Sequence, residues 1–348
     1  MFYERGNLKT PLISIIIVNW NGKPFLEDCL GSLRQQSFRD FETVLVDNGS
    51  RDGSLEFVRE RFPEVRTFAL ADNRGFAGGN NAGIAVAHGK YIALLNNDTK
   101  ADPQWLARLV DALHASGDRT GMWASKILSF GSPVVIDNVG LLLYPDGTGR
   151  GKGRLEQDHG QYDRETEALL PSGCAGLYRR SMLDEIGLFD EEYFAYADDV
   201  DLGLRGRLAG WGCRFVPDAV VHHRYSASSS AYSPLKAFLV ERNRLWVLWK
   251  YFPLELIAAS FWYTPKRLLY QFIAALRGRG SSGRFRREQG ILTAAATLLK
   301  AWCSALGGLP RILRQRQRMR GIRRMKRREF TLLLRRFELT AAELAEKE

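Results

Sequence analysis

The chain has 348 residues, of which 45% are hydrophobic and 11% aromatic, and this composition excludes an intrinsically disordered protein. Its four cysteines are far apart and form no CxxC pair, which argues against a structural zinc site or a disulfide framework and fits a reducing compartment. Residues 241–348 contain 24 Lys and Arg against 8 Asp and Glu, a net charge of +16, so residues 1–240 carry −5 of the total of +11. Such a basic region predicts contact with nucleic acid or anionic lipid, unless it is only a solvated helix face.

The first 125 residues alternate strand-like and helix-like segments. Strands are predicted at residues 12–18, 41–46, 65–70 and 91–95, and helices at 25–33, 54–62, 80–87 and 103–114. The first strand is a β-branched run without polar alternation, which indicates burial on both faces of a parallel sheet. This order of elements predicts an α/β fold with a mostly parallel, right-handed wound sheet.

The rest of the chain departs from this alternation. Short antiparallel strands are predicted at 139–144 and 169–178, helices at 181–187 and 200–209, and a strand at 214–216. Beyond about residue 235 the pattern changes to long amphipathic helices with arginine clusters. We therefore predict a nucleotide-binding catalytic domain over residues 1–235 and a basic helical region over residues 236–348.

Polar clusters follow the predicted strands of the first half. The sequence NWNG begins at Asn19, DNGS begins at Asp47, NNDT begins at Asn96, and DNRGFAGGNNAG begins at Asp72. One such cluster is ordinary turn chemistry. Several on the same edge of a parallel sheet would line one ligand-binding crevice.

The motifs VNWNG, VDNGS, NRGFAGGNNAG, LLNNDT and FAYADDVDLGLRGRLAGW, in this order, resemble the family 2 glycosyltransferases of the GT-A fold. The nearest subgroup is the bacterial rhamnosyltransferase-like enzymes, and the resemblance covers roughly residues 10–250. It implies a metal-dependent, inverting hexosyltransferase that uses a nucleoside-diphosphate sugar. The best assignment by subgroup is rhamnose from dTDP-rhamnose, moved to a saccharide or polyprenyl-linked acceptor in cell wall polysaccharide biosynthesis.

The resemblance and the strand-end chemistry together give the predicted nucleotide-sugar site. Asp47 is the best nucleotide contact, because a carboxylate accepts hydrogen bonds from a base N–H or from ribose, although it could instead cap the turn before Gly49. The planar guanidinium of Arg74 suits the base or the diphosphate. The glycines would let the backbone approach the donor. The predicted nucleotide-sugar-binding residues are Asn19, Asn21, Asp47, Asn48, Asn73, Arg74, Gly75, Gly78, Asn81, Asn97 and Asp98.

Asp98 is also the predicted ligand of Mg²⁺ or Mn²⁺, which would neutralise the charge on the leaving diphosphate. The family commonly has Asp-x-Asp here, whereas this chain has Asn96-Asn97-Asp98, and Asp98 could instead cap the loop before the next helix. His222 and His223 are candidate metal ligands, with His223 slightly favoured by its spacing to Ser228.

The run Asp198-Asp199-Val200-Asp201 contains the predicted catalytic base. The family's general base corresponds to Asp199, which would remove the proton of the acceptor hydroxyl on the face opposite the leaving group. Asp198 and Asp201 are secondary candidates, and acids in a first helical turn also serve the helix dipole. Asp201 could also form a surface pair with Arg205.

Gly173 and Cys174 are predicted on the acceptor side of the site. Gly173 leaves room for substrate, and no base stands beside Cys174 in the sequence, so the thiol is not predicted to be a nucleophile.

Residues 254–276 approach the length of a membrane span, but Pro265, Lys266 and Arg267 interrupt them. We predict helices that lie in a membrane interface, with anionic lipid under the arginine cluster of residues 311–328. The aromatic residues expected at headgroup depth are Phe261, Trp262, Tyr263 and Tyr270. With no secretory signal in the first 14 residues, the protein is predicted to be cytoplasmic and peripherally attached to the inner face of the cell membrane. The alternative is that these helices pack against a partner subunit, including a second copy of this chain.

Two other functions have weaker support. A nucleotidyltransferase shares a similar sheet, but it would usually have a glycine-rich loop with a basic residue where this chain has Asn19-Trp20-Asn21-Gly22. A nucleic-acid-binding protein could use the arginine cluster, but the first 240 residues resemble no such module and are net acidic, so no nucleic acid partner is expected.

Overall fold

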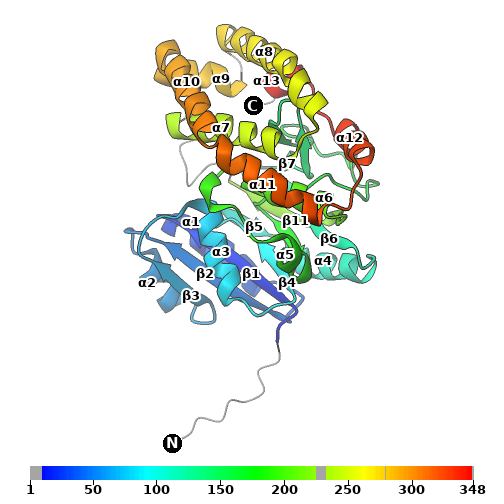
Figure 1. The fold of residues 1–348 in the computed structure, drawn as a ribbon. Coiled ribbons are helices and arrows are strands. Elements are labelled where there is room, and N and C mark those ends of the chain that lie inside the picture. Colours follow the sequence, from blue (N-terminus) through cyan, green and yellow to red (C-terminus); the bar gives the residue numbers. More distant parts are fainter. Residues whose placement is uncertain (1–9, 225–232, 279, 347–348) are drawn as a thin grey trace, which may run out of the picture.

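The computed structural model describes residues 10–224, 233–278 and 280–346, so Ser228 lies outside the described residues. A large mixed sheet forms the body, and the C-terminal helices lie together beyond one end of it (Figure 1). The strands are β1 (Ile13–Asn19), β2 (Phe41–Asn48), β3 (Arg66–Leu70), β4 (Tyr91–Leu94), β5 (Thr99–Ala101), β6 (Thr120–Ser129), β7 (Ser132–Asn138), β10 (Gly176–Arg179) and β11 (Gly212–His223). A separate hairpin pairs β8 (Leu141–Leu143) with β9 (Gly149–Gly151).

The strand order in the sheet is β3-β2-β1-β4-β10-β6-β11-β5, with β7 paired to β6. Strands β3, β2, β1 and β4 are all parallel, as predicted. Strand β10 runs antiparallel between β4 and β6, and β11 then runs parallel to β6. The predicted fold class, a wound α/β sheet followed by a helical region, is confirmed.

Helices cover both faces of this sheet. They are α1 (Lys23–Arg34), α2 (Ser54–Arg61), α3 (Gly75–Val86), α4 (Trp105–His114), α5 (Arg180–Ile186) and α6 (Asp198–Leu208), with a 3-10 helix at Glu191–Tyr193. Alternate isoleucines of β1 pack into two different hydrophobic clusters. Ile15 and Ile17 join the cluster with α1 and α4, whereas Ile16 joins the cluster with α3 and α5. The first strand is thus buried on both faces, as its composition predicts.

Helix α3 begins at Gly75, five residues before its predicted start at Asn80, so the glycine run lies inside the helix and is not a loop. The reason is close packing on the sheet. A Cβ atom at Gly79 would lie 2.6 Å from Val18 Cγ1, and one at Gly83 would lie 2.4 Å from Ile16 Cγ2. Only glycine lets the helix axis approach β1 this closely, which outweighs its poor helix propensity.

The strand predicted at 214–216 extends to Gly212–His223, because it pairs along most of its length with β6, which the sequence pattern did not reveal. Both candidate histidines therefore lie at the end of β11. Successive side chains on a strand point to opposite faces, so His222 and His223 face different sides of the sheet.

The C-terminal helices are α7 (Pro234–Tyr251), α8 (Leu254–Leu276), α9 (Gly280–Gln289), α10 (Ile291–Gly307), α11 (Leu309–Ile322), α12 (Arg327–Arg336) and α13 (Ala341–Glu346). Their core is shared with the sheet domain. Trp246, Val247 and Leu248 of α7 belong to the same hydrophobic cluster as Val200 and Leu204 of α6. The domain boundary near residue 235 stays a prediction, and the packing across it is continuous.

In the described part of the chain, no helix by itself has the length and apolar character of a membrane span. Residues Gly283–Gln289 of α9 and Ile291–Gly307 of α10 meet the composition of a broken span only as a pair, and they are bent by 107° relative to each other.

Candidate active site

Asp47 lies at the carboxyl end of β2, directly beside Asn19 at the end of β1. One of its carboxylate oxygens, Oδ2, accepts a hydrogen bond from Ser50 N at 3.2 Å. The other, Oδ1, is buried and has no hydrogen-bond partner among the described residues. The turn therefore fixes the carboxylate and leaves one strong acceptor available for a ligand.

Predicted asparagines connect the ends of β1, β2 and β4. Asn97 Nδ2 donates to Asn19 Oδ1 at 2.7 Å, and Asn19 Nδ2 donates to Ser50 Oγ at 3.2 Å. Asn21 Oδ1 accepts a hydrogen bond from Arg51 N at 2.8 Å. These amides bond to the protein itself, so they hold the strand-end loops in place around Asp47.

Asn48 and Asn73 shape the loop that precedes α3. Asn48 Nδ2 donates to Asn73 Oδ1 and to Gly75 O, both at 3.0 Å, and Asn48 Oδ1 accepts from Arg74 N at 2.9 Å. The side chain of Arg74 is 54% exposed, and its Nε lies 3.8 Å from Asp72 Oδ1. Gly78 lies one turn further along α3 and packs against the Arg74 side chain.

Asn81 does not join this group. Its Nδ2 donates to Phe189 O at 3.0 Å and to Glu191 Oε1 at 2.9 Å, and its Oδ1 accepts from Phe189 N at 3.0 Å. The amide therefore connects α3 to the segment before α6, away from Asp47.

Asp98 and His223 meet on the neighbouring part of the sheet edge. His223 Nε2 lies 3.3 Å from Asp98 Oδ1, and His223 Nδ1 lies 2.7 Å from Asp137 Oδ2 at the end of β7. Asp98 Oδ1 is buried and has this ion-pair contact with His223 but no further partner among the described residues. The half-buried His222 pairs with Lys100 on β5 and lies on the other face.

The charge state of His223 follows from these neighbours. Burial by itself opposes a charged imidazole, but Cys174 and the carboxylates of Asp137 and Asp98 raise the pKa of His223 well above its ordinary value. Burial raises the pKa of the Cys174 thiol, which is consistent with a thiol that is no nucleophile. For His222, burial lowers the pKa.

Asp198 and Asp199 begin α6. Asp199 Oδ2 accepts a hydrogen bond from Gly173 N at 2.9 Å, and Asp199 Oδ1 accepts from Val200 N at 2.8 Å. Asp198 Oδ1 accepts from Asp199 N at 3.1 Å, whereas its buried Oδ2 has no hydrogen-bond partner among the described residues. Burial raises the pKa of both carboxyls, and for Asp198 the neighbouring charge of Asp199 adds to the effect.

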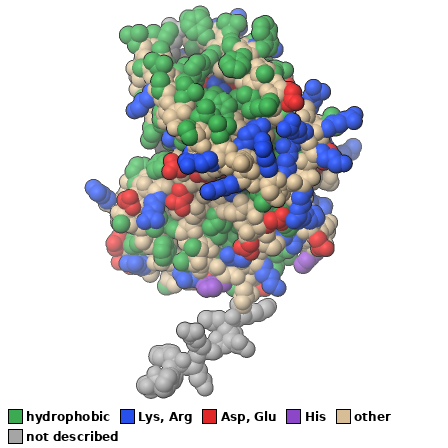
Figure 2. Space-filling view, in the orientation of Figure 1, with side chains coloured by type: hydrophobic (Ala, Val, Ile, Leu, Met, Phe, Trp, Pro, Cys, Tyr) green, Lys and Arg blue, Asp and Glu red, His purple; other side chains and the backbone are tan. Residues whose placement is uncertain are grey.

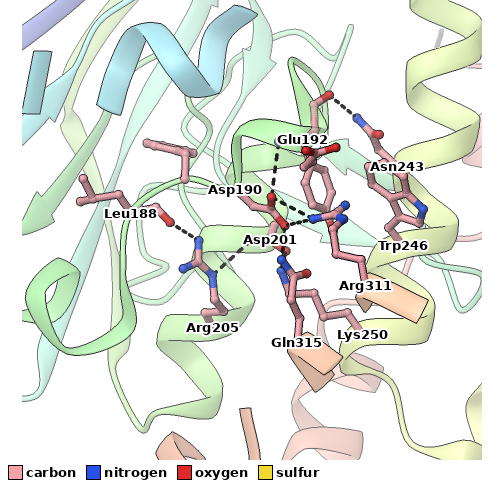
Figure 3. Close-up of polar contacts among 12 residues, drawn as sticks. Leu188, Asp190, Glu192, Asp201, Arg205, Asn243, Trp246, Lys250, Arg311 and Gln315 are labelled. Atoms are coloured by element: carbon pink, nitrogen blue, oxygen red, sulfur yellow. Dashed lines mark hydrogen bonds and ion pairs between the residues drawn. The ribbon is translucent and has the colours of Figure 1, made fainter. Parts of the chain in front are cut away.

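Asp201 points away from this pair. The predicted ion pair with Arg205 forms, but it is buried and does not lie at the surface. Asp201 has no exposed side-chain area, and its Oδ2 accepts from Arg205 Nε at 3.1 Å. Its Oδ1 accepts from Lys250 Nζ and from Tyr251 Oη of α7, both at 2.7 Å. Asp201 thus belongs to the contact between α6 and the C-terminal helices (Figure 3).

A short chain of contacts joins the three predicted key carboxylates. Asp47 connects through Ser50 and Asn19 to Asn97, next to Asp98. The neighbouring Asn96 N donates to Cys174 O at 2.9 Å, and the preceding residue, Gly173, donates to Asp199.

Cys174 interacts with His223, and His223 in turn contacts Asp98. The carboxylates at 47, 98 and 199 therefore lie along one edge of the sheet.

Three residues that contribute to this edge were not among the predicted site residues. Ser50 connects Asp47 with Asn19, Asp137 holds His223, and Asn243 of α7 contacts the segment before α6. The DNGS motif gave a local signal for Ser50. Nothing in the sequence signals the other two, because their partners are far away along the chain.

Comparison with known proteins finds relatives over most of this chain. The sequence model of the family described as Glycosyl transferase family 2 matches residues 14–187. An N-acetylglucosaminyl-diphospho-decaprenol L-rhamnosyltransferase of Mycobacterium tuberculosis is 28% identical over 323 residues, which cover 80% of this chain and 97% of the relative.

Two solved structures share the GT-A fold at low identity. GalNAc-T7 with UDP, GalNAc and Mn²⁺ has a TM-score of 0.56 and 19% identity, over 70% of this chain and 48% of that chain. TarS residues 1–349 of S. aureus in complex with UDP has a TM-score of 0.52 and 18% identity, over 96% of this chain and 90% of that chain.

Proposed function

The chain belongs to glycosyl transferase family 2, and from this membership and the site geometry we propose that it transfers a sugar from a nucleoside-diphosphate donor with inversion at the anomeric carbon. One observation carries the proposal. Asp47 and Asp198 each keep a buried carboxylate oxygen that has no hydrogen-bond partner among the described residues, and the buried Asp98 Oδ1 pairs with His223 Nε2 at 3.3 Å, along the sheet edge that the family motifs form. Buried acceptors are rarely left unsatisfied, so these oxygens fit a ligand with hydroxyl groups, N–H groups and a metal.

On the donor side, Asp47 Oδ1 is suited to accept hydrogen bonds from the base or the ribose. The exposed guanidinium of Arg74 can stack on the base or contact the diphosphate. The first turn of α3 lies directly beyond Arg74, and two of its backbone N–H groups already bond to the protein: Gly75 N donates to Asn73 Oδ1 at 2.8 Å and Ala77 N donates to Phe194 O at 3.2 Å.

The residues around Asp98 fit a divalent cation, Mg²⁺ or Mn²⁺. Asp98 Oδ1 is buried and pairs with His223 Nε2 at 3.3 Å, so a cation bound here would replace the Nε2 proton, and Asp137 orients the ring through Nδ1, as carboxylates do for metal-bound histidines. When bound, the cation would neutralise charge on the leaving diphosphate. No cluster of three or more His, Cys, Asp or Glu in the described ranges has a metal-ligand arrangement, so diphosphate and water would complete the coordination.

On the acceptor side, Asp199 is the proposed general base. Burial raises its pKa toward the range useful for taking a hydroxyl proton, and the Gly173 and Val200 amides fix its orientation. The rhamnosyl donor and a polyprenyl-linked acceptor are supported by the named activity of the Mycobacterium tuberculosis relative at 28% identity.

A lipid-linked acceptor fits the surface of the C-terminal helices. Figure 2 shows hydrophobic side chains gathered over α8 and α10, with Lys and Arg side chains next to them toward α11 and α12. Phe261 and Trp262 of α8 are 83% and 75% exposed, and Leu292 and Leu299 of α10 are 83% and 65% exposed. We propose that this apolar surface enters the inner face of the cell membrane while the arginines contact anionic headgroups.

Arg311 is an exception within the arginine cluster of residues 311–328. Its Nη1 donates to Asp190 Oδ2 at 2.8 Å, so this side chain joins α11 to the segment before α6 and does not face lipid. The exposed members, including Arg314, Arg318 and Arg320, remain available to anionic headgroups.

Vesicle binding tests the membrane proposal. A double variant, Phe261→Ser with Trp262→Ser, is expected to lower partitioning into vesicles of phosphatidylglycerol and phosphatidylcholine by about 10²–10⁴-fold, because each aromatic side chain contributes about 1.5–3 kcal/mol on burial. Flotation measures it, and added salt should weaken binding further. Val134→Ser with Phe68→Ser, which removes two exposed apolar side chains elsewhere, is the matched control. Equal flotation of the aromatic double variant and wild type, or self-association through this surface without lipid, would contradict the proposal.

Nucleotide-sugar binding tests the transferase itself. In a thermal-unfolding screen of dTDP-, UDP- and GDP-sugars, the donor is expected to stabilise the protein by about 2.7 kcal/mol at 100 times its Kd, and only weakly when Mn²⁺ is omitted. Asp47→Ala should abolish the shift, and Asp111→Ala, which changes an exposed side chain on α4, should keep it. Pyrophosphate release from a nucleoside triphosphate, with no response to any nucleotide sugar, would favour a nucleotidyltransferase instead.

A further inference from the structure

The segment that leads into Asp198 and Asp199 has an unfavourable backbone conformation. Phe194, Tyr196 and Ala197 have φ values of 64°, 66° and 60°, although none of them is glycine. Phe194, with ψ of −61°, is the centre of a tight turn in which Ala195 N donates to Tyr193 O at 2.8 Å. Turns of this kind are rare and strained. Such a segment persists only if its surroundings impose it.

The side chain that holds this segment in its strained conformation comes from α7. Asn243 has no exposed area, and its Nδ2 donates to Tyr193 O at 3.0 Å, to Ala195 O at 2.9 Å and to Tyr196 O at 2.7 Å. One amide nitrogen thus contacts three carbonyls of the strained segment, and Figure 3 shows Asn243 reaching it from α7. The neighbouring Arg242 supports the contact by donating from Nε to Asn243 Oδ1 at 2.9 Å.

The other sides of the segment are also fixed. Ala77 N of α3 donates to Phe194 O at 3.2 Å, and a Cβ atom at Gly75 would lie 2.2 Å from that oxygen. At the start of the segment, Asp190 accepts hydrogen bonds from Arg311 and Gln315 of α11, both at 2.8 Å (Figure 3). Two C-terminal helices and α3 therefore enclose the segment.

We infer that Asn243 is a positioning residue for catalysis, which sets the direction of the Asp198 and Asp199 carboxylates by holding residues 193–196 in the strained conformation. This inference rests on the proposed function. It makes α7, which lies outside the residues that the family model matches, a necessary part of the active site. The C-terminal region thus completes the site in addition to any role at a membrane.

The test is the variant Asn243→Asp, which has the same shape but places a carboxylate against three carbonyl oxygens. We expect kcat to fall about 10²-fold, the loss that follows a displacement of about 1 Å, with little change in the KM for the donor because Asp47 is untouched. The control is Gln36→Glu, since the buried Gln36 amide also donates to two backbone carbonyls, Ser32 O at 3.3 Å and Asp102 O at 2.7 Å, away from the site. Gln36→Glu should lower the free energy of unfolding by about as much as Asn243→Asp does, but it should leave kcat per folded molecule unchanged.

A second pair of variants covers the case in which Asn243→Asp does not fold. Asn243→Ala should also lose kcat, and adding Ala197→Gly should restore part of it, because glycine adopts positive φ without strain. A wild-type kcat in Asn243→Ala, or a kcat loss in Gln36→Glu of the same size, would overturn the inference. If Asn243 variants keep activity while Asp199→Asn loses it, only the positioning role fails. If Asp199→Asn also keeps its activity, the assignment of Asp199 as the base fails, and if the wild type turns over no nucleotide sugar, the proposed function itself fails.

Discussion

Asp199→Asn is expected to lower kcat by about 10²–10⁴-fold, the usual contribution of a general base. The amide keeps the size of the side chain but cannot accept the proton of the acceptor hydroxyl. One of the two backbone hydrogen bonds, from Gly173 N or Val200 N, can still form to the remaining oxygen. The variant should therefore fold, bind the donor and show an unchanged donor-induced thermal shift. Steady-state transfer assays with the donor identified by screening measure the loss.

The pH profile separates a base from a residue that merely shapes the site. Because burial raises the pKa of Asp199 above the ordinary value for an aspartate, the ionised, active form grows as pH rises through that raised value. Wild-type log kcat should thus rise with unit slope on the acid side and then level off, whereas Asp199→Asn should show no such limb. Asp111→Asn, an exposed acid on α4, should keep both the profile and the rate. A wild-type rate or an unchanged acid limb in Asp199→Asn would show that another group is the base.

Much of the fold could be predicted from local patterns. The isoleucine run of β1 required burial on two faces, and the alternation of elements then led to a wound sheet. The beginning of α3 could not be found in this way, because glycine disfavours helices and only contact with Val18 explains its presence. Strand β6 was missed because its role is set by β11, some 90 residues later in the chain.

The site shows the same division between local and long-range information. Strand-end clusters correctly indicated one edge of the sheet, since the carboxyl ends of parallel strands meet there. The sequence could not show that Asn19, Asn48 and Asn97 bond to other protein groups. An asparagine that holds a loop and an asparagine that binds a ligand are identical in the sequence. Asp137 and Asn243 reach the site only through tertiary packing.

The charge pattern of the C-terminal region predicts a basic surface, and burial changes that interpretation. Arg267, predicted to interrupt an apolar segment, is 4% exposed and lies between two acids. Charge counting along the chain gives the net charge of a region correctly. It cannot tell which arginines face solvent and which neutralise buried carboxylates.

Arg267→Met is expected to destabilise the protein by about 3–5 kcal/mol, the usual cost of removing one partner from a buried ion pair. Arg267 Nε donates to Asp146 Oδ2 at 2.7 Å, and its Nη2 donates to Glu241 Oε2 at 2.9 Å. Arg244 alone would then face two buried carboxylates, at 3.6 Å from Asp146 Oδ2 and bonded to Glu241. Urea unfolding measures the loss, with Lys266→Met on the exposed neighbour as the control.

The pH dependence of this loss identifies its cause. Burial opposes ionisation of Asp146 and Glu241, but the charges of Arg267 and Arg244 lower the pKa of both below their ordinary values. In the wild type, their stabilisation is therefore present above the ordinary carboxyl pKa and is lost as pH falls through the lowered values. In Arg267→Met the two carboxylates have lost one of their cationic partners and gain by taking up protons, so the difference from wild type should be largest near pH 7 and shrink toward pH 4. A difference that stays constant over this range would indicate lost packing and not lost charge. Because Asp146 belongs to the sheet domain and Glu241 and Arg267 to α7 and α8, a single unfolding transition in both proteins would follow from the shared core.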